Sequence, residues 1–369
     1  MSRLSRYLVR LYLVRLAVVL LAVTGFALVF DLLDMGPRVV RRAGGSTWAL
    51  LAYVPIRLPT LVTELLPMVA LVAGLLTASD LLRWRELVAM WGAGVSRLAL
   101  VGRLWPVALV VLGGKLLLDD LAVPATVPAL RAMGAADFKT VGLPSGGAIW
   151  LKAGNDVLRL PSDAAALGQP RDLLILRLDP QGRLVERIEA ARAEPGPEGW
   201  LLREVVRRPA ASRPVERLEE FLWPVRIELD QVALMAKLPR ELSIAQLVRV
   251  IEADGFGVGG TEGHRTWLQA RLAGLVALWA TIALPFALVR RLARVGETFA
   301  LFAKGLAIGF VHLIANGLLL ALGELGLVAP ALAAWTAPLL FASFVLVLAG
   351  AFEQRRGRPL GPPLGVVGA

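Results

Sequence analysis

The chain has 369 residues, of which 57% are hydrophobic, and contains no cysteine. Its mean hydropathy of +0.66 is too high for a soluble enzyme and typical of a membrane protein. Without cysteine there are no disulfides, thiolate metal sites or cysteine nucleophiles. The formal net charge is +11, but residues 137–240 carry 16 basic and 15 acidic side chains. The excess charge therefore lies beside the apolar segments, which argues against nucleic acid as a partner.

Six apolar segments lie three on each side of a polar block, and the last five have about the 20 residues that a membrane-spanning helix needs. The first continues backward to Tyr7 as a helix-compatible stretch, so we expect a full span and not a cleaved signal. The six predicted spans are residues 16–30, 58–79, 98–118, 267–289, 299–322 and 331–349.

Arginines in the short connections predict the orientation, because cytoplasmic loops are enriched in them. Four groups fall on one face, which we assign to the cytoplasm. The cluster of Arg38, Arg41, Arg42 and Arg57 on the other face is an exception. The four cytoplasmic groups are Arg3, Arg6, Arg10 and Arg15; Arg83, Arg85 and Arg97; Arg290, Arg291 and Arg294; and Arg355, Arg356 and Arg358.

Arg38, Arg41 and Arg42 have two interpretations. They form either a solvated loop or a phosphate clamp, since guanidinium groups make bidentate hydrogen bonds to phosphates. The sequence leaves both open.

Residues 80–96, between the second and third spans, predict a short amphipathic cytoplasmic helix. Trp84, Leu87, Val88 and Trp91 share one face at helical spacing. This is either an interfacial helix with its tryptophans at the headgroups, or a coupling helix that binds a cytosolic motor and presents Glu86 to a basic residue there. The chain has no Walker lysine motif, so ATP hydrolysis would have to come from a partner.

The pattern of the polar block at 119–265 predicts β structure with short strands and tight turns. Such strands form a meander or a jelly roll. Turn signals occur at 153–156, 179–183 and 195–199. Ser243 and Gln246 then form a capping box before a short amphipathic helix. The glycine-containing loop 255–263 lacks the Lys-Ser/Thr of a phosphate loop and is interpreted as a hinge.

Ionisable residues inside spans are candidates for function because their burial in lipid is costly. Glu64, Lys304, Arg103 and Lys115 are close enough to interfaces to snorkel. His312, one turn from Asn316, is interpreted as a hydrogen-bonded packing residue rather than a proton relay. Neither histidine belongs to a metal-binding pair and no Gly-x-Ser-x-Gly occurs, so we expect no catalytic residue, metal or cofactor.

Several motifs together resemble the lipopolysaccharide export permeases LptF/LptG, over essentially the whole chain. The Glu-Leu-Val-x-Met-x-x-x-Gly stretch from Glu86 and the Trp150-x-Lys152-x-Gly154-Asn155 strand motif are the most specific, and together resemble LptG more than LptF. The other matching segments are Arg6-Tyr7-Leu8, Leu58-Pro59, Leu66-Pro67-Met68, Gly92-Ala93-Gly94-Val95-Ser96, Leu242-Ser243 and Ala283-Leu284-Pro285-Phe286.

The resemblance implies one permease half of an ABC transporter. Two related six-span permeases, here an LptG-like chain and an LptF-like partner, enclose a cavity, and a dimer of the ATPase LptB drives them. Glu86 matches the acidic coupling residue, and its neighbours Arg83, Trp84, Arg85, Leu87 and Met90 complete the expected ATPase contact. Spans one and five would form lateral gates, with Phe26, Phe30, Phe310 and Asn316.

The resemblance also implies that the polar block is a periplasmic β-jellyroll that passes lipopolysaccharide to LptC and then LptA. LptG-like proteins tend to carry lysines at the outer end of span one. Asp34 and Met35 occupy that register here, so Arg38, Arg41 and Arg42 are our candidate substrate-binding residues.

We therefore expect an α-helical inner-membrane protein with six transmembrane helices and a periplasmic β-jellyroll inserted between helices 3 and 4. The expected domains are residues 1–118, 119–265 and 266–369. The alternatives are an LptF paralogue, an ABC permease for another lipid, or a membrane scaffold that transports nothing.

Overall fold

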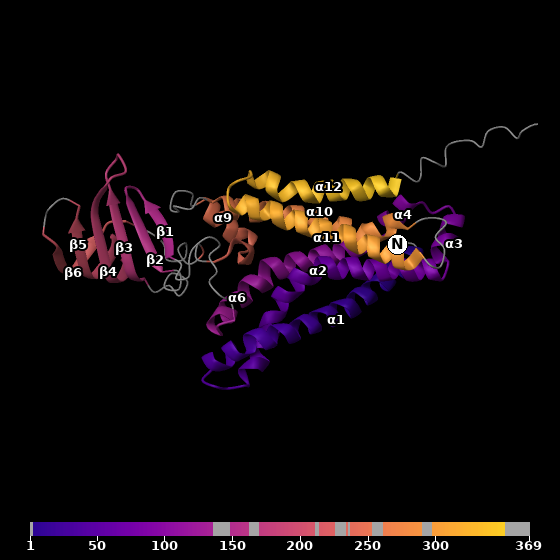
Figure 1. Cartoon of the computed structure of the whole chain (residues 1–369), viewed down its shortest axis with the longest axis horizontal. Coiled ribbons are helices and arrows are strands. Elements are labelled where there is room, and N and C mark those ends of the chain that lie inside the picture. Colours follow the sequence, from indigo (N-terminus) through magenta and orange to yellow (C-terminus); the bar gives the residue numbers. More distant parts are fainter. Residues whose placement is uncertain are drawn as a thin grey trace, which may run out of the picture.

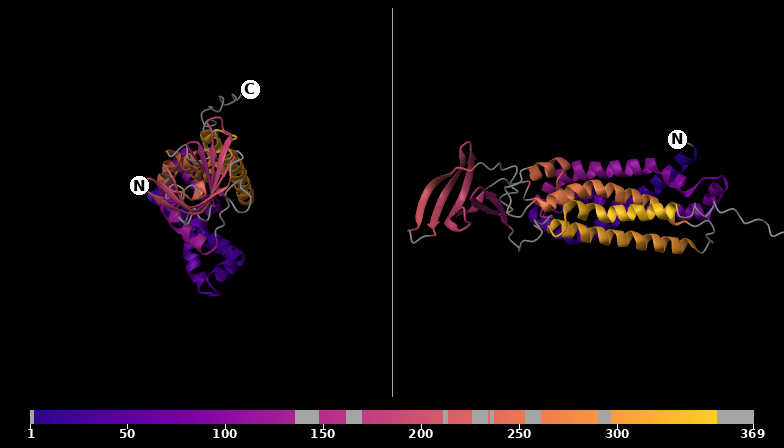
Figure 2. Two further views of the ribbon diagram at one scale, coloured as in Figure 1. Left: turned by 90° about the vertical axis from the view of Figure 1, so that its left-hand side faces the viewer. Right: turned by 90° about the horizontal axis from the view of Figure 1, so that it is seen from above.

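A computed structural model describes residues 3–135, 148–161, 170–210, 214–225, 234, 237–252, 261–289 and 297–350. The helices form an elongated bundle, and a β-sheet lies beyond one end of it (Figure 1, Figure 2). The N-terminus and the short helix α3 (Glu86–Gly92) lie at the opposite end. The sheet and α3 are thus separated by the length of the bundle.

Five of the described helices are long and apolar enough to cross a membrane. α10 is the central one, packing against α2, α11 and α12, with a nearly continuous buried run from Ala280 to Ala287. These helices agree with five of the six predicted spans. They are α1 (Arg3–Arg42), α2 (Ala49–Arg83), α10 (Glu262–Leu288), α11 (Glu297–Glu324) and α12 (Pro330–Gly350).

The predicted span at 98–118 is not one continuous helix. α4 (Arg97–Gly102) ends early, and α5 (Trp105–Leu117) starts after a break at Arg103 and Leu104. Pro106 accounts for the break, because proline lacks an N–H and is favoured in the first turn of a helix. A π-helical turn, η1 (Leu118–Ala122), and α6 (Val123–Ala132) follow. A sixth span is therefore not confirmed.

α1 and α2 form a long antiparallel hairpin. With 40 residues, α1 is about 60 Å long, whereas the hydrocarbon core of a bilayer is about 30 Å thick. Near the turn of the hairpin, Val39, Tyr53 and Leu130 form a small buried cluster that joins the hairpin to α6. The hairpin therefore extends beyond one face of the membrane.

The β-sheet has six antiparallel strands in chain order, β1 to β6. This up-and-down order confirms an inserted antiparallel β domain. The described strands form a single sheet, so the predicted jellyroll is not confirmed. The strands are β1 (Ala148–Ala153), β2 (Asp156–Pro161), β3 (Arg171–Leu178), β4 (Leu184–Gly196), β5 (Gly199–Pro209) and β6 (Glu216–Trp223).

All three predicted turns connect neighbouring strands. Gly154 and Gly182 adopt positive φ, as tight turns require. In the β3–β4 turn, the Asp179 carboxylate accepts hydrogen bonds from the backbone N–H groups of Gln181 and Arg183. These bonds hold the pKa of Asp179 below its ordinary value, and the bond from the Arg183 N–H contributes most.

One face of the sheet carries a compact core. Trp200 and Trp223 are fully buried and meet edge to face, with ring centroids 6.2 Å apart. The Trp223 indole N–H donates to the buried Asp156 carboxylate at 2.7 Å, and Arg177 donates to the same carboxylate. β6, which the sequence did not predict, is fixed by this contact to the start of β2.

The predicted capping box forms at the start of α9 (Ile244–Glu252). The Ser243 backbone N–H donates to the Gln246 side chain at 3.0 Å, and the Gln246 N–H donates to Ser243 Oγ at 3.2 Å. Several predictions lie outside the described residues: most of the loop 255–263, and the arginine groups at 290–294 and 355–358.

Replacing Gly199 by alanine should destabilise the sheet by about 2–3 kcal/mol. Gly199 has φ +140°, and an added Cβ would lie 2.2 Å from the Trp223 carbonyl oxygen and 2.9 Å from Pro224 Cα, which are backbone atoms. Gly182→Ala is the matched control, because Gly182 also has positive φ but has open space around it. Thermal unfolding followed by tryptophan fluorescence should show the larger loss for Gly199→Ala. Equal losses would contradict the steric explanation.

Candidate functional site

A buried ionic cluster joins the helices at the end of the bundle nearest the sheet. Asp119, in the π-helical turn η1, accepts from Lys115 Nζ at 2.7 Å and from Arg271 Nη1 at 3.1 Å. The Arg271 side chain is 6% exposed and that of Asp119 is 14% exposed. Charges are rarely buried without such pairing, and π-helical turns often mark functional positions. Asp119 therefore links α5 to α10.

The same cluster holds the segment that returns from the β domain. Arg271 Nη2 donates to the carbonyl oxygens of Arg240 and Leu242, each at 2.9 Å. Asp120 accepts from the Ile244 backbone N–H at 2.5 Å, at the start of α9. We call Lys115, Asp119, Asp120, Arg131, Glu241 and Arg271 the collar, because these residues attach that segment to the bundle.

The last ion pair of the collar joins Arg131 of α6 to Glu241 of η2 (Pro239–Glu241). Burial opposes both charges, so it raises the pKa of Glu241 and lowers the pKa of Arg131. The ion pair therefore offsets part of the cost of burying these two charges.

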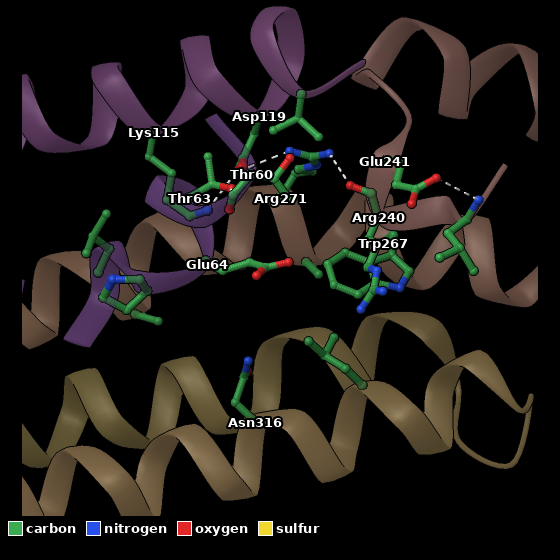
Figure 3. A pocket seen from close by; sticks show the side chains of 18 of the residues that line it. Thr60, Thr63, Glu64, Lys115, Asp119, Arg240, Glu241, Trp267, Arg271 and Asn316 are labelled. Carbon is green, nitrogen blue, oxygen red and sulfur yellow. Dashed lines mark hydrogen bonds and ion pairs between the residues drawn. The ribbon is translucent and has the colours of Figure 1, made fainter. Parts of the chain in front are cut away.

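A cavity of about 540 Å³ lies beside the collar, between α2, α5, α10 and α11. Its volume is in the range of small-molecule binding sites. Figure 3 shows Glu64 and Asn316 pointing into it from opposite helices, with Lys115, Asp119 and Arg271 along one wall. Apolar walls complete it, supplied by residues such as Leu278, Leu313 and Leu320. The cavity is therefore amphiphilic.

Glu64 and Arg240 are the ionic groups of the cavity that are most accessible. Both are exposed. Within the described residues, neither side chain has an ion pair or side-chain hydrogen bond. The cavity thus offers charges of both signs to a ligand.

His312 lines the cavity but is mainly a packing residue. Its ring stacks on Phe341 of α12 with centroids 4.1 Å apart and an angle of 11° between the planes. Its side chain is largely buried. The stacking agrees with the packing part of the interpretation, but within the described residues the His312 ring forms no hydrogen bond. Asn316, one turn further along α11, points into the cavity (Figure 3).

Of the four outer arginines, the structure places only Arg57 on the wall of this cavity. Arg57 Nε and Nη2 donate to Asp31 of α1 at 3.0 and 2.9 Å, and the Tyr53 hydroxyl donates to the same carboxylate. Arg38, Arg41 and Arg42 are exposed at the end of α1 and do not belong to the described cavity lining. The three predicted substrate residues thus form a separate group at the C-terminal end of α1, where they also complement the helix dipole.

The expected gate residues lie on the outer faces of two helices. Phe26 and Phe30 of α1 pack together at 4.8 Å and are 68% and 57% exposed. Phe310 of α11 is 42% exposed. Only Asn316 of this group lines the cavity. These faces are available to lipid or to another subunit.

At the opposite end of the bundle, the coupling helix is shorter than the predicted 80–96. Asp80 to Arg83 belong to α2, and Arg85 adopts a left-handed conformation with φ 58° that breaks the helix. α3 therefore begins at Glu86. This break also corrects the predicted apolar face: Leu87 and Trp91 are buried, while Trp84 is 71% exposed and Val88 45% exposed.

The expected ATPase contact residues remain clustered at this end. Arg83 and Trp84 form an exposed cation–π contact at 5.9 Å. Met90 packs against the core. Glu86 is half-buried, and its carboxylate accepts a hydrogen bond from the Tyr7 hydroxyl at 3.1 Å.

Apolar helices of spanning length, an amphiphilic cavity in their bundle and a β domain at one end define a multi-pass membrane protein with an extramembrane β domain. The sequence matches the family described as lipopolysaccharide export system permease LptF/LptG over residues 6–350, and the chain belongs to this family. It is therefore a permease component of lipopolysaccharide export. Comparison with individual curated proteins gives no match.

Proposed function

We propose that the chain is the LptG-like permease subunit of an ABC transporter that extracts lipopolysaccharide from the inner membrane. A dimer of the ATPase LptB drives the transporter, and an LptF-like permease forms its other half. The observation that carries the proposal is the separation of α3 and the β-sheet at opposite ends of the bundle (Figure 1). The cavity and the collar lie where the segment returning from the sheet, with Arg240 and Glu241, meets the bundle. The end with α3 binds the ATPase and receives its movement, and the end with the β-sheet releases the lipid.

In this proposal α4 and α5, continued by η1, form the sixth span. The sheet faces the periplasm as a jellyroll and hands the lipid to LptC and then LptA. That fits a physical need, because acyl chains must cross water within an apolar surface.

The substrate enters between α1 and α11 of the two permeases, past Phe26, Phe30 and Phe310. The exposed faces of these helices support such an entrance. Arg38, Arg41 and Arg42 meet the phosphates at the outer membrane surface, where guanidinium groups are suited to bidentate binding. The cavity beside the collar then contacts the lipid on its way to the sheet.

Lipid mass spectrometry on the gently solubilised complex tests the proposal. We expect lipopolysaccharide together with a copurified ATPase. Another lipid with an ATPase would indicate a different ABC permease. Neither lipopolysaccharide nor an ATPase in the complex would indicate a scaffold and overturn the proposal.

A further inference from the structure

The Glu86 carboxylate is held from one side. The Tyr7 hydroxyl donates to Glu86 Oε1 at 3.1 Å. Within the described residues, no hydrogen bond to Oε2 is formed, and the half-buried Glu86 follows three exposed residues, Arg83 to Arg85. A hydrogen bond to one oxygen restricts the rotation of the carboxylate and leaves the other oxygen for a cation.

Tyr7 is itself on a firmly attached part of α1. Ser5 Oγ donates to the Arg103 carbonyl oxygen at 3.2 Å, at the break between α4 and α5. Arg15 forms an ion pair with Asp80 of α2 at 2.6 Å, and Leu8 is fully buried between these contacts. The first turns of α1 therefore contact α2, α3 and the α4–α5 break together.

We propose that Tyr7 is a positioning residue: its hydroxyl orients the Glu86 carboxylate towards a cationic side chain of the ATPase and connects α3 directly to α1. This inference rests on the proposed function, which makes α3 the contact with the ATPase. α3 has only seven residues and is joined to α2 through the left-handed Arg85. Without the Tyr7 contact, α3 has more freedom to move at this joint.

The connection to α1 has a mechanical consequence. α1 is one helix from Arg3 to Arg42, so it joins Tyr7 to the exposed pair of Phe26 and Phe30 and to the outer tip. A movement of α3 is transmitted to α1 through Tyr7, in parallel with the path through α2. Tyr7 thus influences how ATPase movement reaches the face where lipid enters.

The test is a double-mutant cycle in the full complex, with Tyr7→Phe, Glu86→Gln and the double variant. Tyr7→Phe removes only the hydroxyl, so we expect the ATPase to copurify while the lipid released per ATP hydrolysed falls about three- to tenfold. In the Glu86→Gln background, Tyr7→Phe should cause no comparable further loss. Unchanged lipid release per ATP in Tyr7→Phe would overturn the inference. So would a double variant whose fold-loss in lipid release equals the product of the fold-losses in the two single variants.

A second measurement reports the contact itself, without any transport. The chain has no cysteine, so cysteines at positions 7 and 86 are the only thiols available to a short bis-maleimide cross-linker. We expect efficient cross-linking of this pair and little with cysteines at 14 and 86, because Val14 lies two turns further along α1. Absence of the 7–86 product would overturn the contact.

The two measurements separate the possible failures. Suppose that the variant with cysteines at 7 and 86 is cross-linked but the unaltered chain copurifies no ATPase. The proposed function is then wrong, and so is the role of Tyr7 that depends on it. If an ATPase copurifies but Tyr7→Phe behaves as the unaltered chain, only the role of Tyr7 fails.

Discussion

Replacing Glu86 by lysine should abolish export while the chain still inserts into the membrane. The substitution places a cation beside Arg83 and Arg85 and removes the acceptor of the Tyr7 hydroxyl. Losing one partner of a desolvated ion pair costs about 2–5 kcal/mol in a protein interface, so ATPase binding should weaken on the order of 100-fold. Insertion should be unaffected, because Glu86 is outside the long apolar helices.

Copurification of the ATPase and export of lipopolysaccharide in cells are the measurements. Glu219→Lys provides a matched charge reversal, because Glu219 is exposed on β6, far from α3. We expect Glu219→Lys to export normally. Normal ATPase binding and export by Glu86→Lys would show that the coupling assignment is wrong.

The sequence predicted the parts of the fold that depend on local pattern. Five spans follow from apolar runs of spanning length, and the hairpins follow from Gly and Asp at the turns, such as Asp179 and Gly182. The interrupted span and the short coupling helix were missed. A hydropathy average over about 20 residues does not show the helix break at Pro106. It also gives no information on backbone conformation, so it cannot show the left-handed Arg85 between α2 and α3.

The collar was missed because its members are far apart in sequence. Lys115 was noted as an intramembrane charge and interpreted as a snorkelling residue, yet its amine is paired with Asp119. The detectable signal was Arg271 within the apolar segment at 267–289, because a charge there requires a partner. Which partner it has is decided by the π-helical turn at η1, whose backbone places Asp119 towards α10.

The lining of the cavity also depends on tertiary packing. Glycines of α11 allow this helix to approach α2 closely: a Cβ on Gly305 would lie 2.5 Å from Leu75 Cδ2, and one on Gly309 would lie 2.3 Å from Leu71 Cδ2. The sequence does not show which helix these glycines face. This contact brings Asn316 and Glu64 to the same cavity.

Asp119→Asn should destabilise the bundle by about 3–5 kcal/mol, because it leaves the buried cations Lys115 and Arg271 without their shared carboxylate. Lys115→Met should cost much less, about 1 kcal/mol, because Asp119 then keeps its contact with Arg271. Both variants keep the size of the side chain roughly constant, so the difference reports charge rather than packing. Thermal unfolding in detergent, followed by size-exclusion chromatography, measures it.

Asp119→Asn should also weaken the attachment of the returning segment, since Arg271 holds the carbonyl groups of Arg240 and Leu242 in place. We therefore expect proteolytic cleavage between the sheet and the bundle to become faster in Asp119→Asn than in Lys115→Met. A matched exposed change, Glu194→Gln in the surface pair with Arg203, should alter stability by less than about 1 kcal/mol. Similar losses in all three variants would mean that the collar contributes no more than an ordinary surface ion pair.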